Sequence, residues 1–191
     1  MNIHLDPETH TYLCDGVVYP SVTQILQDEG FIDATWFTEY ARDRGTLVHR
    51  ITHWYDTGEL DMESVDPALG GYLEGWIRFR EESGFDPQII ERPLASHTHR
   101  FAGTPDRIGV LNGDLAIPDI KSGAVQAWTG LQLAGYEILY GQRVNRFGVQ
   151  LTEDGKYKLI PFTDRNDRGV FMAALSTWWW KECNQKRRET A

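Results

Sequence analysis

The sequence FAGTPDRIGVLNGDLAIPDIKSGAVQAWTGLQLAGY, residues 101–136, contains the clearest local structural signals in the chain. Two apolar runs flank Asn112-Gly113, and this pair favours a type I′ hairpin turn because both of its central residues need a positive φ. The pattern therefore predicts two antiparallel strands. A helix is predicted to follow, with Gln132 and Tyr136 one turn apart on it.

The predicted hairpin gathers acidic and basic side chains at one edge. Asp119 and Lys121 are two residues apart on the second strand, so both point to one side and Ile120 points to the other. The first strand carries Asp106, which the hairpin brings alongside them. Two neighbouring carboxylates repel each other unless a cation or a proton intervenes, and hard oxygen ligands favour Mg²⁺ or Mn²⁺ over zinc. This pattern indicates phosphodiester hydrolysis, while an ordinary ion pair on a solvated hairpin is the alternative.

Several short motifs in this order resemble the PD-(D/E)XK nuclease superfamily, and most closely its RecB-like exonuclease branch. The matching residues are Gly103-x-x-Asp106, Asp119-x-Lys121, Gln132-x-x-x-Tyr136 and, on an upstream helix, Gly45-Thr46-Leu47-Val48-His49. A weaker likeness at the N-terminus points to phage-type members. The resemblance implies an α/β fold with a restriction-endonuclease-like mixed β-sheet core flanked by helices.

The same resemblance implies a metal site. Asp106 and Asp119 are the implied carboxylate ligands, His49 is an additional ligand, and the backbone carbonyl of Ile120 is a further one. His53 competes with His49, because residues four apart share one face of a helix. A lone helical histidine is otherwise more often a surface residue or a hydrogen-bonded core residue.

Other residues are implied to contact the reacting groups or the substrate. Lys121 would position the attacking water and offset charge on the phosphate. Gln132, Tyr136 and Trp128 share a helical face that, by resemblance, lies next to the site. Gln132 and Tyr136 would contact substrate phosphate or order the Lys121 strand, and Trp128 would contact the substrate. The alternative is a polar patch beside a core aromatic residue. Ser122 is a further candidate for binding phosphate.

Two features leave alternatives open. Glu91 lies on the strand before Asp106, where it would join or support the metal site or form a surface ion pair with Arg92. Trp178–Trp180 cannot all face the core, since three successive helical residues cover about 300° of the helix. They form a stacking platform for single strands, or two of them pack and one lies at the edge. The basic residues in 181–188 would touch phosphates or stay solvated.

The remaining patterns predict one domain over residues 1–191. Its N-terminal part, 1–85, holds a hairpin and helices with the histidine motif, and 86–191 holds the sheet core and flanking helices. The predicted elements are strands within 3–19, a helix capped by Ser21 and ending near 29, helices at 34–55 and 67–83, a strand at 88–91, a hairpin of strands 146–151 and 157–160, and a helix at 164–182.

Composition excludes several classes. Hydrophobic residues at 41% and charged residues at 25% are typical of a globular protein. No window approaches the roughly 20 apolar residues of a membrane span, and no signal peptide is visible. We therefore expect no membrane partner and a cytoplasmic location, in a bacterial or phage-infected host cell. Cys14 and Cys183 cannot supply the four thiolates of an iron–sulfur cluster. The net charge of −9 argues against a broadly basic nucleic-acid surface.

These inferences predict a Mg²⁺- or Mn²⁺-dependent DNA exonuclease that acts in recombination, repair or end processing. Its partner would be DNA, as a single strand or a duplex end, together with recombination or replication proteins. One alternative is a structure-specific or restriction-type endonuclease with the same site. Another is a catalytically idle binding or assembly module, and RNA stays open as the substrate.

Overall fold

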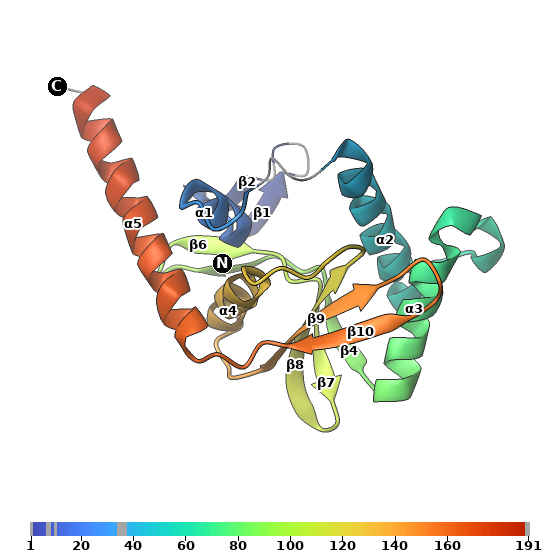
Figure 1. Cartoon of the computed structure of the whole chain (residues 1–191). Coiled ribbons are helices and arrows are strands. Elements are labelled where there is room, and N and C mark those ends of the chain that lie inside the picture. The colour runs from blue at the N-terminus through green and yellow to red at the C-terminus, as the bar shows by residue number, and fades with distance from the viewer. Residues whose placement is uncertain (1, 7–8, 10, 34–37, 190–191) are drawn as a thin grey trace.

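The computed structural model describes residues 2–6, 9, 11–33 and 38–189, and the side chains of all of these except 186–189 (Figure 1). Its centre is a five-stranded sheet with the order β10-β9-β8-β7-β4. These strands are β4 (Asp86–Ile90), β7 (Arg107–Leu111), β8 (Asp114–Lys121), β9 (Asn145–Leu151) and β10 (Tyr157–Pro161). β8 and β9 run parallel, and the other neighbouring pairs run antiparallel. This mixed sheet confirms the predicted α/β fold class.

Helices flank the sheet on both faces, which accounts for the nearly continuous burial of β8. The helices are α1 (Val22–Asp28), α2 (Glu39–Thr57), the short 3-10 helix η2 (Met62–Ser64), α3 (Pro67–Ser83), α4 (Thr129–Tyr140) and α5 (Asn166–Glu189). In Figure 1, α2 and α3 lie on one side of the sheet, and α4 and α5 lie on the other. One apolar cluster joins α1, α4 and α5 to Ile117 of β8, and a second joins α2 and α3 to Ile120.

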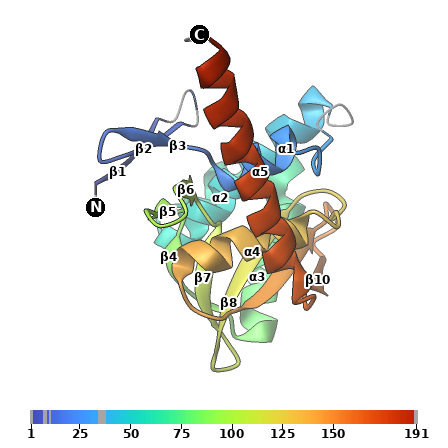
Figure 2. The same cartoon turned by 90° about the vertical axis from the view of Figure 1, so that its left-hand side faces the viewer.

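Two smaller sheets lie outside the central one. β1 (Ile3–Asp6), β2 (Thr11–Cys14) and β3 (Val17–Tyr19) form a three-stranded antiparallel sheet near the N-terminus, as predicted (Figure 2). β5 (Leu94–Ser96) pairs with β6 (Phe101–Gly103). This second pair was not predicted, because each strand is only three residues long.

The structure confirms two predictions that depend on residues close together in the sequence, a turn and a helix cap. Asn112 and Gly113 have φ angles of 53° and 88°, as a type I′ turn requires. Ser21 caps α1, and its side chain accepts a hydrogen bond of 2.9 Å from the backbone N–H of Gln24. The hairpin and the first helix therefore form for the predicted reasons.

The predicted strand positions of two acidic residues are wrong. β7 begins at Arg107, so Asp106 lies just before the strand and not within it. Pro105 precedes it and has no N–H to donate to a strand ladder, which accounts for the late start. Glu91 follows β4, whose last residue is Ile90, and it has a positive φ of 43°. Both carboxylates therefore sit on irregular backbone at the edge of the sheet.

The long helices differ from prediction at their ends. The predicted start at Ala34 lies outside the described residues, and α2 spans Glu39–Thr57. α5 continues to Glu189 instead of ending at 182, and Figure 2 shows its C-terminal part extending past the body. Within the described part of the chain, no helix is long and apolar enough to cross a membrane.

Candidate active site

The hairpin geometry brings Asp106 next to Asp119. β7 and β8 are antiparallel with Gly109 opposite Ala116, so the same register continued three residues further places the two aspartates opposite each other. A hydrogen bond confirms the approach, because the backbone N–H of Ile120 donates to Asp106 Oδ2 at 2.7 Å. The sequence correctly predicted that the hairpin joins these groups at one edge.

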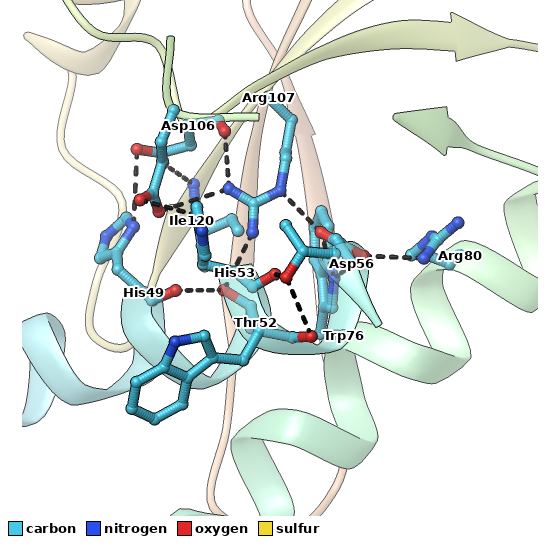
Figure 3. Close-up of polar contacts among 12 residues, drawn as sticks. His49, Thr52, His53, Asp56, Trp76, Arg80, Asp106, Arg107 and Ile120 are labelled. Atoms are coloured by element: carbon cyan, nitrogen blue, oxygen red, sulfur yellow. Dashed lines mark hydrogen bonds and ion pairs between the residues drawn. The ribbon is translucent and has the colours of Figure 1, made fainter. Parts of the chain in front are cut away.

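α2 brings a histidine to the same place. His49 Nδ1 lies 3.5 Å from Asp106 Oδ1, and Figure 3 shows the ring facing that carboxylate. Together with the Ile120 amide, this contact occupies both oxygens of Asp106. His49, predicted on the family pattern alone, therefore adjoins the predicted carboxylate site.

Asp119 and Lys121 form a tight ion pair, with 2.6 Å between Asp119 Oδ2 and Lys121 Nζ. Only 3% of the Asp119 side chain is exposed, against 22% for Lys121. Burial raises the pKa of the Asp119 carboxyl, Asp106 raises it further, and Lys121 and His49 oppose the rise. For Lys121, burial alone would lower the pKa, but the charges of Asp119 and Asp106 outweigh it and the pKa is raised. The ammonium form is therefore favoured.

α4 surrounds Lys121 with further groups. Lys121 Nζ lies 3.5 Å from Gln132 Oε1 and 5.4 Å from the centre of the Trp128 ring. The amide of Gln132 in turn donates to Tyr136 Oη at 3.2 Å and to Thr23 Oγ1 at 3.4 Å. Burial raises the pKa of Tyr136 well above its ordinary value, so its hydroxyl stays protonated. Gln132 therefore adjoins Lys121, while the roles predicted for Gln132, Tyr136 and Trp128 stay predictions.

Glu91 also belongs to this region. Its Oε2 lies 3.0 Å from His53 Nδ1, and its Oε1 lies 3.4 Å from a guanidinium nitrogen of Arg107. Among the contacts of the described residues, Glu91 pairs with His53 and Arg107, and the alternative surface ion pair with Arg92 is not found. His53 therefore pairs with a different carboxylate from His49, and the two histidine–carboxylate pairs lie one helical turn apart.

Ser122 has a protein partner in this structure. Its Oγ accepts a long hydrogen bond of 3.5 Å from Arg44 Nε, on α2. The Ser122 hydroxyl thus lies between the end of β8 and the guanidinium of Arg44. The predicted phosphate contact of Ser122 stays a prediction.

The site opens into a cavity of about 720 Å³. His49, His53, Glu91 and Asp106 line it together with Tyr136. Its other lining residues are Leu5, Tyr12, Ser21, Val22, Thr23, Ala41, Arg42, Gly45, Thr46, Arg50, Gly103 and Thr104. The wall formed by the N-terminal sheet and α1 is partly apolar, whereas α2 contributes the two arginines. Asp119 and Lys121 are not among the lining residues.

The metal-binding expectation stays a prediction. Two carboxylates and an imidazole suit a divalent cation with a preference for oxygen. Among the described residues, however, no group of three or more His, Cys, Asp and Glu side chains is arranged to hold a metal ion. Asp119 Oδ2 contacts Lys121 Nζ at 2.6 Å, so in a site with His49 and Asp106 the Asp119 carboxylate would bind through Oδ1 or after leaving Lys121. The carbonyl of Ile120 stays a predicted ligand.

A buried polar network beneath the site was not predicted. Asp56 accepts from Arg107, Arg80 and the indole of Trp76 (Figure 3). Arg107 is completely buried, although it directly follows Asp106. No local pattern marks a buried arginine, because the partner Asp56 is 51 residues away in sequence.

The tryptophans of α5 do not form a continuous stacking surface. Trp178 donates its indole N–H to Asp28 at 2.8 Å, and its ring meets that of Trp179 edge-to-face at 5.0 Å. Both pack against the core cluster, whereas Trp180 is 67% exposed. This matches the alternative in which two pack and one lies at the edge. The side chains of Lys186, Arg187 and Arg188 lie outside the described residues.

Comparison with known proteins supports the fold. No family model matches the sequence, and no curated protein matches it. A solved structure from Eubacterium rectale, provisionally described as an exonuclease, is 11% identical with a TM-score of 0.53, covering 83% of this chain and 77% of that one. An alkaline exonuclease from Laribacter hongkongensis is 15% identical with a TM-score of 0.38, covering 91% and 95%. The chain therefore shares its mixed-sheet fold with the Eubacterium rectale protein.

Proposed function

We propose that this chain is a divalent-metal-dependent deoxyribonuclease that acts as an exonuclease. The observation that carries this proposal is the convergence of His49, Asp106, Asp119 and Lys121 at one edge of the sheet. These residues come from α2, the start of β7 and the end of β8. The fold shared with a protein described as an exonuclease supports the proposal further.

Each side chain has a distinct proposed role. His49, Asp106 and Asp119 would hold Mg²⁺ or Mn²⁺, with Glu91 supporting them from the His53 side. The bound ion supplies Lewis acidity and lowers the pKa of water. Lys121, held as an ammonium by its acidic neighbours, orients the attacking water and offsets charge on the phosphate. Gln132 and Trp128 keep Lys121 in place.

The proposed substrate is DNA with a free end. The cavity of about 720 Å³ lies between α2 on one side and the N-terminal sheet and α1 on the other. We propose a free end because the chain shares its fold with a protein described as an exonuclease. We place the activity in recombination, repair or end processing in the cytoplasm of a bacterial or phage-infected cell, alongside replication or recombination proteins.

Digestion of linear and covalently closed circular DNA, with Mg²⁺ or Mn²⁺ and with a chelator, tests the proposal. We expect metal-dependent loss of linear DNA and an intact circle. Lys121→Met should abolish the reaction, whereas Lys156→Met should retain it, because the Lys156 side chain is 71% exposed on the β9–β10 turn.

Each contrary result points to a named alternative. Cutting of the closed circle would identify an endonuclease, and degradation of RNA alone would change the substrate class. Activity that survives Lys121→Met would show that the site lies elsewhere. The absence of any metal-dependent cleavage would favour an idle binding module.

A further inference from the structure

Arg107 contacts two residues of the candidate site, Asp106 and Glu91, although the motifs omit it. The side chain is fully buried. Its Nε donates to Asp56 Oδ2 at 2.6 Å, and Nη1 donates to the backbone carbonyl of Asp106 at 2.6 Å. Nη1 also lies 3.4 Å from Glu91 Oε1, and Nη2 lies 3.5 Å from Thr52 Oγ1. One planar guanidinium thus spans the segments that carry the acidic groups.

The carbonyl of Asp106 is the junction of this arrangement. It accepts from Arg107 and also from the backbone N–H of Glu91 at 3.1 Å. On the α2 side, Thr52 Oγ1 donates to the carbonyl of His49 at 2.9 Å. Arg107 therefore connects the backbone of Asp106, the carboxylate of Glu91 and the helical turn of His49.

Asp56 anchors Arg107 from below. Its carboxylate is fully buried and accepts from Arg80 Nη1 at 2.7 Å and from the Trp76 indole at 3.1 Å, besides the bond from Arg107. A buried charge is costly unless it is paired and hydrogen-bonded. Here the two arginines face two carboxylates, those of Asp56 and Glu91, so the formal charges of this network cancel.

The two arginines on Asp56 differ in what else they touch. Arg80 reaches Asp56 and the face of Tyr55, and its side chain is 26% exposed. Arg107 continues to the irregular backbone around Asp106 and Glu91, outside the strand ladders. One backbone hydrogen bond, from the N–H of Glu91 to the carbonyl of Asp106, joins these segments, and Arg107 adds side-chain donors to it. Arg80 therefore has contacts of a structural kind, whereas Arg107 also contacts the backbone that carries the site carboxylates.

We propose that Arg107, anchored by Asp56, is a positioning residue that fixes Asp106, Glu91 and His49 relative to one another. This inference rests on the proposed function and deepens it. Groups that orient the primary ligands of a site typically affect affinity or rate by about 10–100-fold when they are replaced.

Arg107→Met and Arg80→Met form a matched pair that tests this role. Each variant leaves Asp56 with one arginine and the Trp76 indole, so the loss to the Asp56 network is comparable. Only Arg107→Met also removes the contacts to Asp106 and Glu91. We expect kcat on linear DNA to fall about 10–100-fold in Arg107→Met. In Arg80→Met we expect kcat to stay within about threefold of the wild type once both proteins are confirmed as folded.

A second readout does not depend on activity. In metal-free protein with ¹⁵N-labelled histidine, the side-chain nitrogen signals of His49 report its contact with Asp106, and His49→Gln assigns them. Arg107→Met should shift these signals, and Arg80→Met should leave them unchanged. Equal effects of the two variants on both readouts, or no effect of Arg107→Met, would overturn the proposal.

A third variant covers the case in which Arg107→Met does not fold. Arg107→Lys keeps a cation beside Asp56, but an ammonium cannot reproduce the fork to Asp106 and Glu91. A folded Arg107→Lys protein with wild-type kcat and wild-type His49 signals would refute the role of the fork. If the wild type itself degrades no nucleic acid, the proposed function fails, while the His49 signals still decide whether Arg107 sets the geometry.

Discussion

Removal of the Lys121 ammonium should destabilise the fold in a pH-dependent way. In Lys121→Met, the carboxylate of Asp119 loses its 2.6 Å partner and stays almost completely buried. A buried carboxylate without a cation takes up a proton, because burial disfavours the charged form. The folded pKa of Asp119, already raised by burial, then rises further. The variant's stability therefore falls as pH rises above the pKa of Asp119 in the unfolded chain.

The size of this effect follows from the free energy needed to keep Asp119 protonated in the folded variant. Keeping a carboxyl with an unfolded pKa of about 3.9 protonated costs about 1.4 kcal/mol per pH unit, or about 4 kcal/mol at pH 7 and about 1.5 kcal/mol at pH 5. Lys121 is 22% exposed, so water offsets part of the loss. We expect the free energy of unfolding to fall by about 3 kcal/mol at pH 7 and about 1 kcal/mol at pH 5.

Urea unfolding followed by tryptophan fluorescence, in chelator at both pH values, measures these losses. The double variant Asp119→Val, Lys121→Met should recover most of the stability at pH 7, since an apolar pair can replace a buried ion pair. Lys156→Met, on the exposed turn, should change stability by less than about 0.5 kcal/mol. An equal loss at pH 5 and pH 7 would refute the reasoning, because the burial of Asp119 would then not be its cause.

Four further perturbations test the fold and the site. Gly71→Ala should cost about 2 kcal/mol or more in urea unfolding, because its Cβ would lie 1.8 Å from the carbonyl oxygen of Glu153. Gly70→Ala meets nothing within 4 Å and should gain about 0.5–1 kcal/mol. Gly113→Ala should cost about 1 kcal/mol, since the turn needs a φ of 88° there. Mg²⁺ should raise the melting temperature of the wild type in calorimetry but not that of Asp119→Asn, and equal shifts in both would remove Asp119 from the ligand set.

The position of Glu91 illustrates how tertiary contacts override local patterns. The run Gln88-Ile89-Ile90-Glu91 predicts a strand through Glu91, but the strand stops at Ile90. The Glu91 carboxylate lies between His53 of α2 and Arg107 of β7 and contacts both. A positive φ at Glu91 turns the chain there, and the amide pairs with the carbonyl of Asp106. None of these partners is near Glu91 in sequence.

Local sequence patterns were sufficient to predict the features that depend on residues a few positions apart. The Asn112-Gly113 turn needs positive φ angles that these residues adopt readily, and the two-residue period of a strand places Asp119 and Lys121 on one side. Together these local rules bring Asp106 beside Asp119.

Contacts between distant segments set the strand order, the pairing of the two histidines and the network around Asp56. β4 lies beside β7 and β8 lies beside β9 through pairings between distant segments. Arg107 is buried because Asp56, 51 residues earlier, is buried with it. The physical reason is that burying a charge is favourable only when its partner is placed in the same interior, and that placement depends on the packing of whole helices against the sheet.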